Sequence, residues 1–125
     1  MVIDSQEIVE LTIEGIGVNM DTATLDVKVN EGATFSMDME FWENTDRSVP
    51  MDITNWTFEG NMKIGNDLFV MGMLITAPNL LTAEIAHTEL VNLGKKGSYD
   101  ISALYGGKSY RVFQGAVTVS PEVAL

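Results

Sequence analysis

The chain has 125 residues, enough for one buried core, and it contains no cysteine, which excludes disulfides, thiolate metal sites and cysteine catalysis. Its formal net charge of −11 argues against nucleic acid and an anionic membrane as partners, because both require clustered Lys and Arg. No apolar run approaches the roughly 20 residues that span a bilayer, and the N-terminus lacks the basic region of a signal peptide. We therefore expect synthesis in the cytoplasm.

The first 20 residues fit neither the helical nor the strand period. Ile13 and Ile16 belong to an apolar set that is compatible with an edge strand, a short helix or an extended arm. Carboxylates are dense in this part of the chain, which predicts either a solvated acidic segment or an arm that docks on a basic surface of another protein. Residues 1–20 are therefore predicted to be an N-terminal arm or edge segment.

Residues 21–125 are predicted to form a single β-sandwich domain. Apolar residues alternate with polar ones over residues 25–29, 35–42, 56–64 and 80–85, and a final hairpin turns at Gly106 and Gly107. Counting the apolar run 68–75, this gives about seven strands joined by Gly, Asn and Pro turns, a pattern typical of an all-β, antiparallel, Ig-like β-sandwich. One short helical turn is expected near residues 87–93, with Leu90 and Leu93 packed inward.

The last strand changes its alternation. Tyr110 and Val112 fall on even positions, whereas Val117 and Val119 fall on odd ones, so one face cannot hold both pairs without a slip in register. Gly115 lies between the two pairs and is the predicted site of a β-bulge.

The segment 68–75 is apolar on both faces. One face can serve the core, and the other needs cover from loops of the same chain or from a partner subunit. Candidate interface residues in this strand are Leu68, Val70, Met71 and Met73. Trp42 is out of phase with the inward residues of its strand, so it is a candidate interface anchor or sugar-stacking platform, unless the following loop covers it.

Few residues of the chain are suited to catalysis or to metal binding. His87 is the single histidine, and its place in a turn favours a surface or capping role. Zinc would need several His or Cys ligands, and the glycine pairs lack the spacing of phosphate-binding loops. Asp38 and Glu40 share a polar face next to an acidic loop, which favours a solvated surface over a calcium site. We expect no enzymatic activity, no catalytic residue, no metal and no cofactor.

Several segments together resemble small β-sandwich domains of virion structural proteins of tailed bacteriophages, which include upper-baseplate, fibre-attachment and Ig-like modules. The resemblance covers about residues 25–123 and is carried by the order of short motifs. These are residues 41–50 with the polar loop, 51–55, the aromatic-led strand 56–64, 80–85, 88–93, Gly-Ser-Tyr-Asp-Ile at 97–101 and Arg-Val-Phe-Gln-Gly-Ala-Val-Thr-Val-Ser at 111–120. Asn55 stands where the family usually has Gly, and residues 1–20 have no counterpart.

The resemblance implies a non-enzymatic structural subunit of the virion, either a tail or baseplate adaptor or a capsid decoration protein. Its partners would be other virion proteins, and it would act as a homo-oligomer or in symmetric copies. The chain stops at Leu125 without fibre or coiled-coil segments, so a stand-alone small subunit is expected. The alternatives are a carbohydrate-binding module, in which Trp42 or Trp56 stacks on a glycan, and a calcium-dependent module.

Overall fold

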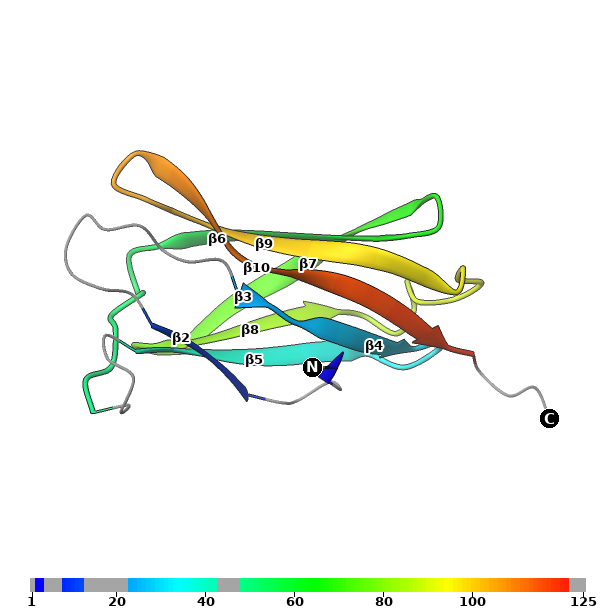
Figure 1. The fold of residues 1–125 in the computed structure, drawn as a ribbon, viewed down its shortest axis with the longest axis horizontal. Helices are drawn as coiled ribbons and strands as arrows, with labels where there is room; N and C mark the ends of the chain where they lie inside the picture. The colour runs from blue at the N-terminus through cyan, green and yellow to red at the C-terminus, as the bar shows by residue number, and fades with distance from the viewer. Residues whose placement is uncertain (1, 4–7, 13–22, 43–47, 122–125) are drawn as a thin grey trace.

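The computed structural model describes residues 2–3, 8–12, 23–42 and 48–121, which fold into strands and turns without a helix (Figure 1). The predicted all-β class is confirmed, and seven strands of five residues or more follow residue 20. The strands are β1 (Val2–Ile3), β2 (Ile8–Thr12), β3 (Ala23–Thr24), β4 (Asp26–Asn30), β5 (Phe35–Trp42), β6 (Thr57–Ile64), β7 (Asp67–Ala77), β8 (Leu80–Ile85), β9 (Lys96–Tyr105) and β10 (Lys108–Ser120).

The strands form one continuous sheet in the order β1-β4-β10-β9-β6-β7-β8-β5-β2, with β3 also paired to β10. Strand β7 folds the sheet over, because its residues 67–71 pair with β6 and its residues 72–77 pair with β8. The two halves then face each other across the core (Figure 1). The curled sheet is nearly barrel-shaped (Figure 1), and the strands at the two ends of its order, β1 and β2, are consecutive in the chain.

The predicted purely antiparallel pairing is wrong. Strand β4 runs parallel to β10, β1 runs parallel to β4, and β2 runs parallel to β5. Period-two alternation identifies a strand with one buried face but does not reveal the direction of its neighbour, and these pairings join segments that no hairpin connects. Strands β1 and β2 lie within the predicted arm, and the division of the chain at residue 20 stays a prediction.

The core lies between the two halves and follows the alternation read from the sequence. In β5 every second side chain from Phe35 to Phe41 is buried, and in β6 the buried side chains are Phe58, Met62 and Ile64. Met37, Met39 and Met62 are fully buried, in line with the use of the flexible thioether to fill irregular core space. Each such side chain contributes roughly 1.5–3 kcal/mol of hydrophobic stabilisation.

The final hairpin turns as predicted. Gly106 and Gly107 have φ angles of 59° and 75°, which residues with a Cβ atom rarely adopt. The predicted helical turn near 87–93 is wrong, because the backbone forms a tight turn in which the N–H of Leu90 donates to the carbonyl of His87. Asn92 follows in the left-handed region, with φ 55°, and this stops helical propagation. Leu90 is buried as expected, at 0% exposure.

The alternation of inward and outward side chains along β10 does shift, but three residues earlier than predicted. Its register with β9 shifts between Arg111 and Phe113, and both Val112 and Phe113 are fully buried. The extra residue of the bulge lets two consecutive side chains point into the core. Gly115 sits in regular pairing opposite Tyr99, and its role is close packing, since a Cβ there would overlap the carbonyl of Leu25.

Candidate functional site: the outward face of strand β7

Strand β7 is apolar on both of its faces. Phe69 and Met71 point into the core, with 8% and 3% exposure. The alternate side chains Leu68, Val70 and Leu74 are 66%, 69% and 60% exposed. We call these three residues the β7 strip. They account for three of the five large hydrophobic side chains that are exposed in the described part of the chain, and they lie on a single strand.

The strip spans the point at which β7 changes partners. Leu68 lies opposite Lys63 on β6, whereas Leu74 lies opposite Thr82 on β8. Gly72, between Val70 and Leu74, has no side chain that could cover its neighbours. The strip therefore runs along the outside of the fold where one half of the sheet passes into the other, and no described loop shields it from solvent.

Leu68 and Val70 thus lie on the surface, where a residue must lie to contact a partner. Met73 is half-buried and packs against the core. Met71 belongs to the core itself and is removed from the candidates, because an anchor must reach a partner. Ile13 and Ile16 lie outside the described residues. Leu74 was missed, although the alternation that exposes Leu68 and Val70 continues to it.

Trp42 ends β5 and is half-buried. Its backbone forms an isolated bridge with Pro50, and its indole Nε1 is buried without a hydrogen-bond partner in the described part of the chain. Trp56 stacks on Tyr105 with ring centroids 4.3 Å apart and planes 6° from parallel. Tyr105 stacks in turn on Tyr110 at 5.1 Å. These last three aromatic side chains therefore pack against one another beside the turn of the last hairpin.

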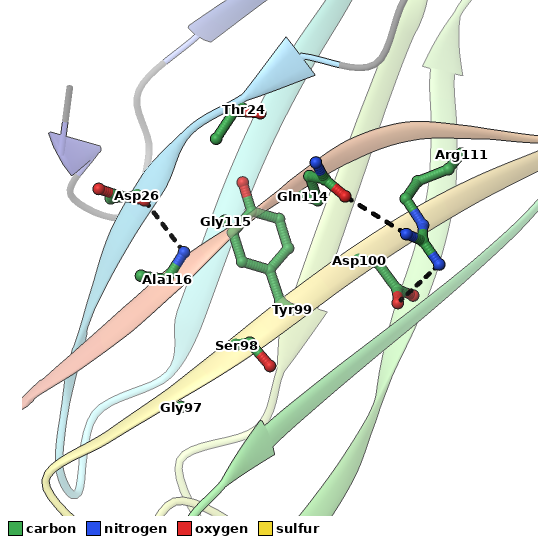
Figure 2. A pocket seen from close by; sticks show the side chains of 10 residues that line it. All are labelled: Thr24, Asp26, Gly97, Ser98, Tyr99, Asp100, Arg111, Gln114, Gly115 and Ala116. Carbon is green, nitrogen blue, oxygen red and sulfur yellow. Dashed lines mark hydrogen bonds and ion pairs between the residues drawn. The ribbon is translucent and has the colours of Figure 1, made fainter.

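A polar pocket of about 410 Å³ lies where β3, β4, β9 and β10 meet (Figure 2). Three of its polar side chains interact with one another: the Arg111 guanidinium lies 3.9 Å from the Asp100 carboxylate and donates to Gln114 Oε1 at 3.4 Å. Asp26 accepts the backbone N–H of Ala116 at 3.0 Å. The Arg111–Asp100 pair is about half exposed, so it contributes at most about 1 kcal/mol to stability.

Tyr99 also lines this pocket, but its ring is buried. Burial, and secondarily the negative charge of Asp26, raises the pKa of Tyr99 well above its ordinary value. The hydroxyl is therefore a hydrogen-bond donor at neutral pH, and it donates to the carbonyl of Leu25. Because the polar side chains of this pocket are paired within the fold, the β7 strip is the stronger candidate for a functional site.

His87 is exposed, and its backbone N–H donates to Thr34 Oγ1 at 3.2 Å. Within the described residues, no group of three or more His, Asp or Glu side chains is placed to hold a metal ion. In that same part of the chain, no helix has the length and apolar character needed to cross a membrane.

No protein-family model matches the sequence, and no curated protein matches it significantly. Among solved structures, the chain is similar to an endo-fucoidan hydrolase from glycoside hydrolase family 107, with a TM-score of 0.51 and 8% identity. That match covers 80% of this chain but only 13% of the hydrolase. A second match is the N-terminal domain of phage TP901-1 ORF48, with a TM-score of 0.48, 11% identity, and coverage of 96% of this chain and 99% of that domain. The chain thus shares its fold with one small part of the hydrolase.

Proposed function

We propose that the protein is a non-enzymatic structural subunit of a tailed-phage virion that acts through protein–protein contacts. It would serve as a tail or baseplate adaptor or as a capsid decoration protein, and its Ig-like sandwich would have mixed strand pairing. The observation that carries the proposal is the β7 strip, whose three aliphatic side chains are 60–69% exposed. The order of short motifs over residues 25–123 supports the class of assembly.

The strip is suited to a protein partner because its apolar groups lie on a regular strand, which holds them in a fixed row. Single exposed hydrophobic residues are common on protein surfaces. A row of three on one strand, in a chain with a net charge of −11, instead indicates a surface that a partner covers. Burying each side chain against a partner would gain roughly 1.5–3 kcal/mol before the costs of association. Trp42 and the stacked Trp56 are less available for a glycan, since the first is half-buried and the second packs on Tyr105.

The test is to locate the protein in the particle. Antibody raised against the recombinant chain is applied with gold label to intact particles of the phage that encodes it, and to dissociated particles on a blot. Label over the head would establish decoration, and label on the tail would establish an adaptor. Absence of the protein from both intact and dissociated particles would overturn the proposal, and an indole shift with a host polysaccharide would then favour the carbohydrate-binding alternative.

A matched pair of variants tests the strip itself. Val70→Asp places a charge in the strip, and Ser109→Asp places the same charge at another exposed site, on β10. Both variants are expected to melt as the wild type does, but only Val70→Asp should lower incorporation into particles, by at least about tenfold. Equal incorporation of the two variants would remove the strip from the interface. Met71 is unsuitable for this test, because Asp at a site that is 3% exposed would report on folding.

A further inference from the structure

We propose that the free edge of strand β7 beside Leu68 and Val70 binds one additional strand, which is an extended, basic segment of another virion protein. The inference deepens the proposed function, on which it rests, because it names the kind of partner that contacts the β7 strip and the way in which that partner binds. Hydrogen bonds between the two backbones would hold the segment, and the exposed side chains of the strip would contact it from one face.

The backbone of β7 directs its hydrogen-bonding groups alternately to its two sides. Strands β6 and β7 are antiparallel and are joined by a turn of two residues, with Ile64 opposite Asp67. In such a hairpin the residues that flank the turn exchange both of their backbone hydrogen bonds, and every second pair after them does the same. The β7 residues that bond to β6 are therefore Asp67, Phe69 and Met71. The N–H and C=O groups of Leu68 and Val70 point away from β6, to the other side of β7.

No strand of the described part of the chain lies on that other side next to Leu68 and Val70. Strand β8 occupies it only alongside the second half of β7, and its pairing ends where Glu84 lies opposite Gly72. Beyond β8 the chain leaves this course for the core, where Leu90 is fully buried. Figure 1 shows the tip of the β6–β7 hairpin, in green, standing clear of the layer that contains β5 and β8. Two backbone donors and two acceptors at strand spacing are therefore open to a partner.

This edge lacks the features by which proteins protect a free strand edge. Such edges usually carry charged side chains, prolines or bulges that discourage pairing with another chain. Residues 68–71 of β7 are Leu-Phe-Val-Met, and they keep a regular register with β6. By contrast, the start of β10, before its pairing with β3 begins at Phe113, carries the exposed polar residues Lys108 and Ser109. The apolar, regular edge of β7 is thus suited to pairing with a strand.

The open backbone groups favour an extended polypeptide as the partner. Another strand offers acceptors and donors at the same spacing, as in the addition of a peptide to a sheet edge, whereas a helix pairs its backbone groups internally. Side chains alternate between the two faces of an added strand. Two apolar residues, two positions apart, would therefore lie on the outward face beside Leu68 and Val70 and shield them from water.

Charge favours another protein over a second copy of this chain. Every copy has a formal net charge of −11, so repulsion opposes the approach of two copies. The open stretch has the exposed Asp67 at one end and the exposed Glu84 at the other. On β6, Glu59 and Lys63 carry opposite charges, so the local excess is acidic. A segment with Lys or Arg next to its apolar pair would be attracted to this edge.

Amide hydrogen exchange of the purified chain tests whether the edge is open. The N–H groups of Leu68 and Val70 are expected to exchange at least about tenfold faster than those of Phe69 and Met71, which donate to β6. Equal protection of the four amides would show that another part of the same chain already occupies the edge, and it would overturn the proposal.

The binding experiment uses overlapping peptides of about 12 residues that span the other proteins of the particle. Peptides with two apolar residues two positions apart, next to Lys or Arg, are expected to bind and to slow exchange of the Leu68 and Val70 amides at least about tenfold. Val70→Pro removes an open N–H, keeps an apolar side chain and spares the bonds to β6, so it should weaken binding at least about tenfold.

Ser109→Pro is the matched control for the proline. Because Lys108 flanks the turn of the last hairpin opposite Tyr105, the N–H of Ser109 also points away from its hairpin partner. This variant should bind the peptides as the wild type does. Circular dichroism melting of both variants separates loss of binding from misfolding, and the exchange of the wild-type amides depends on neither variant.

Three results of the binding experiment would contradict strand addition by another protein. One is that no peptide binds. Another is that Val70→Pro binds as tightly as Ser109→Pro, which would make the contact one of side chains alone. The third is self-association of the chain that Val70→Pro abolishes, since a second copy would then occupy the edge. A chain that is found in particles but binds no peptide would leave the proposed function standing, and a chain that binds peptides but is absent from particles would do the reverse.

Discussion

The hydroxyl of Tyr99 donates a 2.7 Å hydrogen bond to the backbone carbonyl of Leu25, which lies 74 residues away in the chain. The ring reaches this carbonyl across Gly115, where a Cβ would stand only 3.0 Å from the ring atom Cε1. The N–H of Leu25 donates to the carbonyl of Gln114 at 2.8 Å. Both backbone groups of Leu25 are therefore satisfied at the break between β3 and β4, and three segments of the sheet are held together at one point.

Replacement of Tyr99 by Phe is expected to lower the free energy of unfolding by about 1–3 kcal/mol. The ring still fills its place, but the Leu25 carbonyl loses its hydroxyl donor between two residues that are only 8% and 4% exposed. Urea denaturation measures the loss. Tyr110→Phe is the matched control, since no described residue hydrogen-bonds that hydroxyl, and it should change stability by less than about 0.5 kcal/mol. Equal effects of the two substitutions would show that the Tyr99 bond adds no stability.

Replacement of Gly115 by Ala is expected to cost about 3 kcal/mol, because the added methyl would overlap the Leu25 carbonyl and press on Tyr99. Neither neighbour is the free end of a flexible side chain, so the backbone itself must move. Gly72→Ala is the control: its Cβ would meet nothing closer than the Glu84 carbonyl at 3.7 Å, an ordinary contact. The measurement is the thermal unfolding midpoint of each variant. A Gly115→Ala variant as stable as the Gly72→Ala variant would contradict the close packing at Gly115.

Alkaline pH should destabilise the fold through Tyr99. Burial, with a smaller contribution from Asp26, raises the pKa of Tyr99, so the folded protein keeps a proton that an unfolded tyrosine releases at about pH 10. The stabilisation is therefore complete below that pH and is lost as the pH rises above it. Unfolding free energies at pH about 9, 10 and 11 should fall more steeply for the wild type than for Tyr99→Phe. Parallel slopes would assign alkaline sensitivity to other groups.

The all-β class and the positions of β5 and β6 could be predicted because one face of each strand is buried and the other is not. The turn at Gly106 and Gly107 could be predicted because it depends on two adjacent residues with positive φ. Parallel pairing of β4 with β10 could not, since it joins segments that lie far apart in the chain and leaves no local signal. The role of Gly115 was misassigned for the same reason, as the constraint comes from Leu25.

The candidate site could be predicted only in outline. Strand β7 is apolar on the side that faces in and on the side that faces out, so the sequence indicates a second apolar face without revealing which residues form it. The pairing of β7 with β6 and then β8 settles this by placing Met71 inside and Leu74 outside.

Two adjacent residues of β7 allow a direct test of which face is covered in a single chain. Phe69→Ala is expected to cost about 3–5 kcal/mol, since it removes a ring that is 8% exposed and leaves a cavity. Leu68→Ala should cost less than about 0.5 kcal/mol in the monomer, because its side chain is 66% exposed. Urea denaturation at low protein concentration measures both values. A large loss from Leu68→Ala under these conditions would mean that another part of the same chain already covers the β7 strip, and it would remove the basis for a partner there.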